Sequence, residues 1–144
     1  MIKIAHRGNI YGPNEKQENK PEYILKAISL GYDVEVDVWY KSNNFYLGHD
    51  KPEYLIDKSF LLQNGLWCHA KNIMALKKML EIGVKICFWH QEDDCTLTSN
   101  GYIWTYPGKE LNELSICVMP NNLKGINKNC LGVCSDYIGD LDNE

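Results

Sequence analysis

Short apolar runs divide the chain, and they constrain its fold more than any other feature of the sequence. Seven runs are rich in β-branched and aromatic residues: 2–5, 34–39, 66–70, 84–89, 102–106, 116–119 and 131–137. Several are nearly continuous rather than alternating, which is typical of strands that are covered on both faces. We therefore expect parallel strands with helical cover.

The segments between these runs predict helices mainly in the first half of the chain. Segments 20–31 and 72–83 carry apolar residues at a period of 3.6, and each ends in a glycine that suits a helix C-terminus. In the second half only 109–114 predicts a short helix, 121–129 is polar, and the acidic end 139–144 is expected to fray. The alternation fits either a small, incomplete β/α barrel or an open parallel sheet, and the pattern leaves both open.

The chain is expected to form a single domain in the cytoplasm. No fixed repeat, low-complexity tract or linker interrupts the 144 residues, so the domain spans 1–144. The net charge of -4 argues against broad nucleic-acid binding, which needs clustered Lys and Arg. No leader is recognisable, and no apolar run approaches the roughly 20 residues of a membrane span.

Four of the six cysteines lie inside apolar runs: Cys68, Cys87, Cys117 and Cys134. Three disulfides are the alternative, but buried free thiols fit a chain without a secretory signal better. No Cys-x-x-Cys pair occurs, which argues against a structural zinc knuckle.

Two carboxylates, Glu35 and Asp37, are separated by one residue in a run whose neighbouring members are valines. Side chains alternate faces along a strand, so both carboxylates project to the same side. Two buried like charges repel and are costly to desolvate unless a cation lies between them, so the pair predicts a hard divalent metal. The alternative is a solvated face of an edge strand.

Two histidines and two cations follow the strand candidates. His6 and His49 can serve as proton acceptor and donor at one phosphodiester, because imidazole titrates near neutrality. Arg7 presents a planar fork suited to phosphate, and Lys71 a point charge. Each histidine taken singly is more often structural, and each cation can be a surface ion-pair partner; the joint pattern favours catalysis.

The order of these motifs resembles that of the glycerophosphodiester phosphodiesterase family, within the phospholipase-C-like phosphodiesterases. That family is marked by His-Arg-Gly after an apolar strand, a Pro-Glu-Asn-Thr element opening a helix, Glu-x-Asp on a strand, and His-Asp. The corresponding sequences here are IAHRG at 4–8, QENK at 17–20, EVD at 35–37 and LGHD at 47–50. The family's last strand has a counterpart at 132–137.

The resemblance implies a role for each site residue. It implies His6 as base, His49 as acid, Arg7 as a phosphate contact, Glu35 and Asp37 as ligands of magnesium or calcium, and Glu18 in support near the metal and the first histidine. The family continues with Glu-x-Lys on its third strand, and here that place reads His69-Ala70-Lys71. Imidazole favours softer ions, so either His69 stands beside the metal or the ion is manganese or zinc. Glu92 is a candidate compensating ligand, although an acidic loop there is commonly just solvated.

The resemblance further implies a TIM-like β/α barrel with abbreviated helices in the second half, since family members are much longer. It implies metal-dependent hydrolysis of a small glycerophosphodiester-like substrate. Two alternatives remain: a binding protein that keeps the phosphate and metal pocket without turnover, and a lyase that forms a cyclic phosphate. A homodimer would cover faces left bare by missing helices. The aromatic residues Trp39, Trp89, Trp104 and Tyr106 are expected in the core, with a pocket wall as the alternative.

Overall fold

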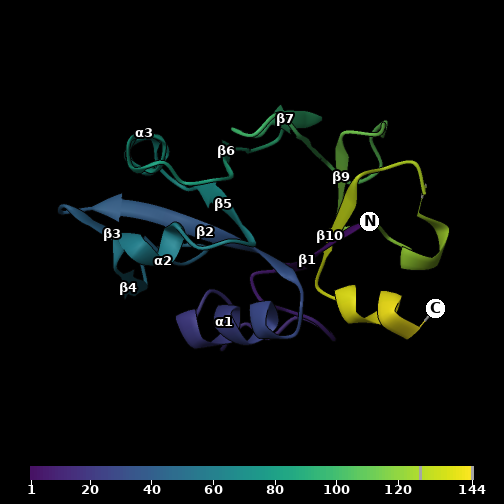
Figure 1. The fold of residues 1–144 in the computed structure, drawn as a ribbon, viewed down its shortest axis with the longest axis horizontal. Coiled ribbons are helices and arrows are strands. Elements are labelled where there is room, and N and C mark those ends of the chain that lie inside the picture. Colours follow the sequence, from purple (N-terminus) through teal and green to yellow (C-terminus); the bar gives the residue numbers. More distant parts are fainter. Residues whose placement is uncertain (127, 144) are drawn as a thin grey trace.

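The computed structural model describes residues 1–126 and 128–143. Ten strands of this part form one curled, mixed sheet. Its centre is β1 (Ile2–His6), which pairs in parallel with β2 (Asp33–Lys41) and with β10 (Gly132–Ser135). Two arms of the sheet extend from β1 and curl toward each other (Figure 1).

The first arm begins with β2. On one edge β2 pairs in parallel with β5 (Leu66–Ala70), which pairs with β6 (Cys87–Trp89). Beyond the end of β1, the other edge of β2 pairs with β3 (Asn44–Leu47), and β3 pairs with β4 (Tyr54–Ile56), both antiparallel. This arm therefore contains both a parallel part and an antiparallel meander.

The second arm is β10, β9 (Ser115–Val118), β8 (Ile103–Thr105) and β7 (Cys95–Leu97). The first three are parallel, whereas β7 is antiparallel to β8. No described strand ladder joins β6 to β7, so the sheet stays open there and forms a half-barrel.

The longer helices lie on the outer face of the first arm. α1 (Pro21–Ser29) connects β1 to β2, and α3 (Ile73–Ile82) connects β5 to β6. α2 (Lys58–Leu61) has a single turn, and two 3₁₀ helices, η1 (Leu123–Gly125) and η2 (Ile138–Asn143), lie in the second half. No helix of the described residues has the length and apolar character needed to cross a bilayer.

The expected TIM-like β/α barrel is wrong. After β6 the described connections are loops, the antiparallel β7 and the short η1, so no α-helix covers the second arm. The predicted helix at 109–114 is also absent: the Asn112 side chain accepts from the backbone N–H of Leu114 (2.9 Å) and forms a local turn instead. The end does not fray as expected, because 138–143 form η2 and Ile138 is buried; residue 144 lies outside the described part.

Two apolar clusters hold the sheet. The valines of β2 (Val34, Val36 and Val38) face outward and pack in the cluster that includes α1 and α3. The second cluster fills the inside of the curl with Ile4, Trp67, Phe88, Trp104, Ile116 and Cys134, all nearly inaccessible. Side chains alternate between the two faces along β2, so with the valines facing outward Glu35 and Asp37 face inward, on the side of this second cluster.

Candidate functional site

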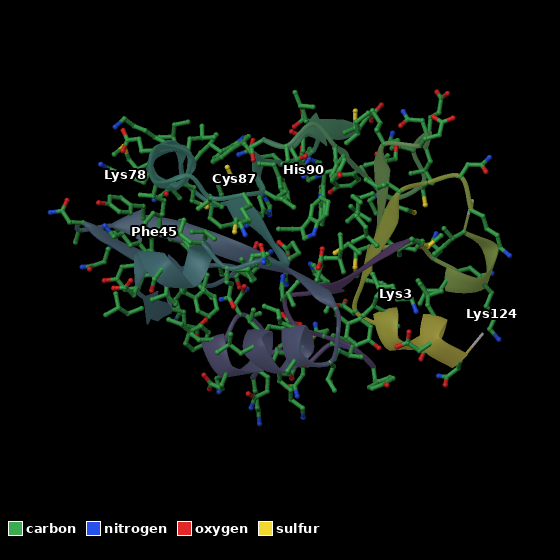
Figure 2. The ribbon with its side chains drawn as sticks, viewed as in Figure 1. Lys3, Phe45, Lys78, Cys87, His90 and Lys124 are labelled. Atoms are coloured by element: carbon green, nitrogen blue, oxygen red, sulfur yellow. The ribbon has the colours of Figure 1, made fainter. Side chains whose placement is uncertain are left out.

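A cavity of about 360 Å³ opens at the carboxyl ends of the parallel strands. Seven of the eight predicted site residues line it: His6, Arg7, Glu35, Asp37, His49, His69 and Lys71. Further walls come from His90, which lies between the two arms of the sheet in Figure 2, and from Trp104 and Tyr106. Trp39 and Trp89 do not line this cavity.

Strand register explains why these side chains meet. In the β1–β2 ladder His6 is opposite Glu35, and in the β2–β5 ladder Asp37 is opposite His69. Residues in register on parallel strands share a face, so two histidines flank the two carboxylates of β2. Lys71 follows the last residue of β5 and reaches the same place.

Glu35 is buried without a hydrogen-bond partner for one oxygen. Its side chain is 3% exposed, and Oε2 has no donor within hydrogen-bonding distance. The nearest imidazole nitrogens are His6 Nε2 at 3.8 Å from Oε2 and His69 Nδ1 at 3.7 Å from Oε1. A buried carboxylate oxygen without a partner carries a large desolvation cost. We therefore expect a cation beside Glu35 Oε2.

Asp37 is held on one side by neutral and cationic donors. Asn19 Nδ2 donates to Oδ2 (2.9 Å), Arg7 Nε lies 3.2 Å from the same oxygen, and Lys71 Nζ is 4.0 Å from Oδ1. Burial opposes ionisation, but His69, Arg7 and Asn19 together hold the pKa of Asp37 well below its usual range. Asp37 is therefore a carboxylate at neutral pH.

His69 presents its Nδ1 to both carboxylates. Its Nε2 donates to the backbone oxygen of His90 (2.8 Å), while Nδ1 lies 3.4 Å from Asp37 Oδ1 and 3.7 Å from Glu35 Oε1. Burial favours the neutral ring, yet the two carboxylates raise the pKa of His69 to about 9. A positive charge at this point, proton or metal ion, is thus strongly favoured.

The donor set fits a divalent ion. One oxygen each of Glu35 and Asp37 and one nitrogen of His69 lie within 4.8 Å of one another. Glu18, predicted near the metal, is not part of this group. Its carboxylate accepts hydrogen bonds from Arg7 Nη1 (3.3 Å) and from the side chain of Asn9 (2.9 Å), and it lines a neighbouring depression.

His6 is oriented by a residue from the other end of the chain. Its Nδ1 donates to Asp136 Oδ1 (2.7 Å), and Asp136 also accepts from Asn9 (2.8 Å). Burial lowers the pKa of His6, but the bond to Asp136 and the charge of Glu35 outweigh it and raise that pKa above the ordinary value. With Nδ1 engaged, Nε2 is the nitrogen that faces Glu35.

His49 lies at the rim rather than in the interior. Its side chain is 44% exposed, and Nδ1 lies 2.8 Å from Asp50 Oδ1. It follows Gly48 (φ +155), where a Cβ would lie 2.1 Å from the backbone oxygen of Lys51, so only glycine fits this turn. His49 also lines the neighbouring depression with Glu18.

Sequence reasoning did not assign a site role to Asn19 or Asp136, and it named His90 only within the segment 90–94, which was expected at the catalytic rim. Asn19 and Asp136 stood in motifs that were noted, and both are buried and bonded to predicted site residues. His90 follows β6 by one residue; its Nδ1 is buried without a partner, and burial and the nearby His69 lower its pKa. The position of His90 directly after the end of β6 is the sequence feature that could have indicated its place at the cavity. Glu92, the candidate compensating ligand, is exposed and does not line the cavity.

Comparison of the chain with protein-family models, with curated proteins and with solved structures gave no match in any of the three. The resemblance to the glycerophosphodiester phosphodiesterases therefore depends on the short motifs described above, and the roles it implies stay predictions.

Proposed function

We propose that this protein is a metal-dependent phosphodiesterase that hydrolyses a small diester of the glycerophosphodiester type. The observation that carries the proposal is the buried pair Glu35 and Asp37, which lies between His6 and His69 with one carboxylate oxygen unpartnered. Such a pair fits a divalent ion, and the ion would stand beside a buried imidazole.

The charges of the cavity suit one phosphate group. Arg7 and Lys71 are each about one-fifth exposed and both approach Asp37 from the cavity side. They would neutralise the phosphate oxygens as charge builds during transfer. Tyr106 and Trp104 offer an apolar wall for the alcohol portion, and a cavity of about 360 Å³ suits a small diester.

The two histidines divide the proton transfers. With His6 Nδ1 donating to Asp136, Nε2 can accept a proton from a water or from a neighbouring hydroxyl of the substrate. His49, at the rim, donates a proton to the departing alkoxide. Glu35, Asp37 and His69 would hold a divalent ion, which would supply Lewis acidity toward the phosphate.

The test is hydrolysis of bis(p-nitrophenyl) phosphate and of glycerophosphocholine. We expect turnover that EDTA abolishes and that His6→Ala and His49→Ala each reduce on glycerophosphocholine by at least about 100-fold, because an alkoxide leaves poorly without an acid. Full activity of His49→Ala on glycerophosphocholine would contradict the proposed roles. Phosphorus NMR separates an open product from the cyclic phosphate of a lyase, and ligand binding without turnover would indicate the binding-protein alternative.

The cytoplasm is the proposed compartment. All six cysteines are free, and five of them are buried, including the four in apolar runs. Unpaired thiols fit a reducing environment, in which disulfides do not persist. The homodimer remains a prediction that light scattering can measure.

A further inference from the structure

The ring of His69 is held in one orientation and one tautomer. A backbone carbonyl only accepts hydrogen bonds, so the bond from Nε2 to the oxygen of His90 (2.8 Å) fixes a hydrogen on Nε2. The ring also stacks on Phe88, with centroids 5.3 Å apart and planes 11° apart. In the neutral ring the lone pair therefore lies on Nδ1, the nitrogen that faces Glu35 and Asp37.

The distances from His69 Nδ1 to the two carboxylates are longer than hydrogen bonds and fit ligands that share one ion. The distances to Asp37 Oδ1 and Glu35 Oε1 are 3.4 Å and 3.7 Å. Charge-assisted N–H···O bonds are shorter, at about 2.7–2.9 Å. Three ligands that each lie about 2.1 Å from one ion at tetrahedral angles are about 3.4 Å apart.

A second observation, on the other oxygen of the same Glu35 carboxylate, also indicates a ligand. Glu35 is 3% exposed, and its Oε2 has no hydrogen-bond partner although the side chain lines the cavity. Asn19 donates to Oδ2 of Asp37, and Arg7 lies beside the same oxygen. The other oxygen, Oδ1, is therefore the one that faces His69. Two carboxylates and a neutral imidazole carry a charge of -2, of which Arg7 and Lys71 offset a part beside Asp37. Glu35 lies between two imidazoles, and a divalent ion would balance its charge.

We infer that Glu35, Asp37 and His69 form a site that selects a borderline transition-metal ion, with Zn²⁺ as the reference, over Mg²⁺ and Ca²⁺. Hard ions prefer shells made of oxygen, whereas imidazole strengthens the binding of Zn²⁺ and similar ions. The inference rests on the proposed function, because both assign metal binding to Glu35, Asp37 and His69. The competing arrangement is a protonated His69 that takes the place of any metal.

The experiment is calorimetric titration of the metal-free protein with ZnCl₂ and, separately, MgCl₂. The wild type is compared with His69→Asp, which restores an all-oxygen shell, and with His49→Asn, which removes the exposed rim imidazole. We expect the ratio of Zn²⁺ to Mg²⁺ affinity to fall at least about tenfold in His69→Asp, because imidazole is lost as a ligand. In His49→Asn the ratio should stay within about twofold of the wild type, since that ring is outside the shell.

X-ray absorption of the Zn²⁺-loaded wild type gives a readout that needs no variant and no activity. We expect imidazole scattering from the bound ion, and absence of that signal overturns the inference even if His69→Asp fails to fold. The inference is also overturned if the wild type binds no ion, if His69→Asp leaves the ratio unchanged, or if His49→Asn removes Zn²⁺ binding. Tight, His69-dependent Zn²⁺ binding without phosphodiester hydrolysis would support the inference and contradict the proposed function.

Discussion

Asn19 illustrates how one residue of a loop positions a charged group of the site. Its side chain donates to Asp37 Oδ2 (2.9 Å) and accepts from the Asp37 backbone N–H (3.0 Å). It is 1% exposed and has a φ of +62°, a conformation that asparagine tolerates better than most residues. Asn19 thus fixes both the backbone and the carboxylate of Asp37.

Replacing Asn19 with alanine should destabilise the protein and loosen the site. We expect a loss of roughly 3 kcal/mol in the free energy of unfolding, from two buried hydrogen bonds and the left-handed backbone. Metal affinity should fall about tenfold, since Asp37 loses its orienting partner. Urea unfolding and titration with ZnCl₂ measure the two effects. Asn43→Ala is the matched control, because Asn43 has the same left-handed backbone (φ +63°) but is exposed. An equal loss of stability in Asn43→Ala would show that the hydrogen bonds of Asn19 contribute nothing.

His69 should make the stability of the metal-free protein depend on pH. Its pKa is about 9 in the folded chain and 6.5 when unfolded, so its contribution is fully present below pH 6.5 and disappears as the pH rises through 9. The loss is roughly 3 kcal/mol at about 1.4 kcal/mol for each pH unit. Urea unfolding in EDTA between pH 6 and 9.5 measures it. His69→Gln should show a flatter profile, and identical profiles would contradict the charged ring.

Sequence reasoning identified the residues at strand ends but not the residues that orient them. Glu35 and Asp37 were recognised because alternation on one strand is a local pattern. The bond between His6 and Asp136 joins positions 130 residues apart, and no local pattern encodes such a contact. The motif predicts Glu18 in support near the metal, and in the fold Glu18 contacts Arg7, which lies beside Asp37.

At the scale of elements, Asn72 connects α3 to β2. Its Oδ1 caps the helix by accepting from the N–H of Ala75 (2.9 Å) and also accepts from the N–H of Tyr40 (3.2 Å). Its Nδ2 donates to the oxygen of Tyr40 (2.9 Å). One side chain therefore fixes the start of a helix and the end of the strand that carries Glu35 and Asp37.

Asn72→Ala should cost about 2 kcal/mol of stability, because the cap and the bonds to Tyr40 are lost together. Asn72→Asp should cost about half as much, since a carboxylate still caps the helix but cannot donate to Tyr40. Thermal or urea unfolding of the two variants gives the comparison. Asp57→Ala, which removes the cap of the short α2, should be milder. Equal losses for Asn72→Ala and Asn72→Asp would mean that capping contributes nothing.

The elements predicted from apolar runs are present, and the errors have physical causes. All seven runs contain strands, and segments 20–31 and 72–83 contain α1 and α3. The strands β3, β4 and β7 were missed because they are short antiparallel segments with exposed residues, which lack a continuous apolar run. The helix at 109–114 was lost to side-chain bonds of Asn112, which local periodicity does not reveal.

At the scale of the whole molecule, β1 joins the two arms of the half-barrel. It pairs with β2 on one side and β10 on the other, and it ends at His6 (Figure 1). The seven apolar runs fit a closed barrel and an open sheet equally well, because closure depends on pairing between distant strands rather than on the pattern within each strand. Among the described strands, the sheet remains open between β6 and β7, the last strands of the two arms.

Widening the contact between β1 and β10 should therefore affect stability and the site together. A Cβ at Gly132 would lie 2.7 Å from the oxygen of Ile2 and 2.8 Å from its Cβ, so Gly132→Ala must push the two strands apart. We expect a loss of about 1–3 kcal/mol in the free energy of unfolding, as for other overpacked positions. The shift should also weaken the bond between His6 and Asp136, which follows β10 directly.

Urea unfolding and the pKa of His6, followed by NMR, measure the two consequences of Gly132→Ala. The pKa of His6 should fall toward its ordinary value, because the bond to Asp136 is one of the contacts that raise it. Gly125→Ala is the matched control, since a Cβ there meets only ordinary contacts, the nearest at 3.5 Å to Asn122 Nδ2. If Gly132→Ala lowers stability but leaves the pKa of His6 unchanged, the packing of β1 against β10 does not control the environment of the His6 imidazole, and the two arms act independently.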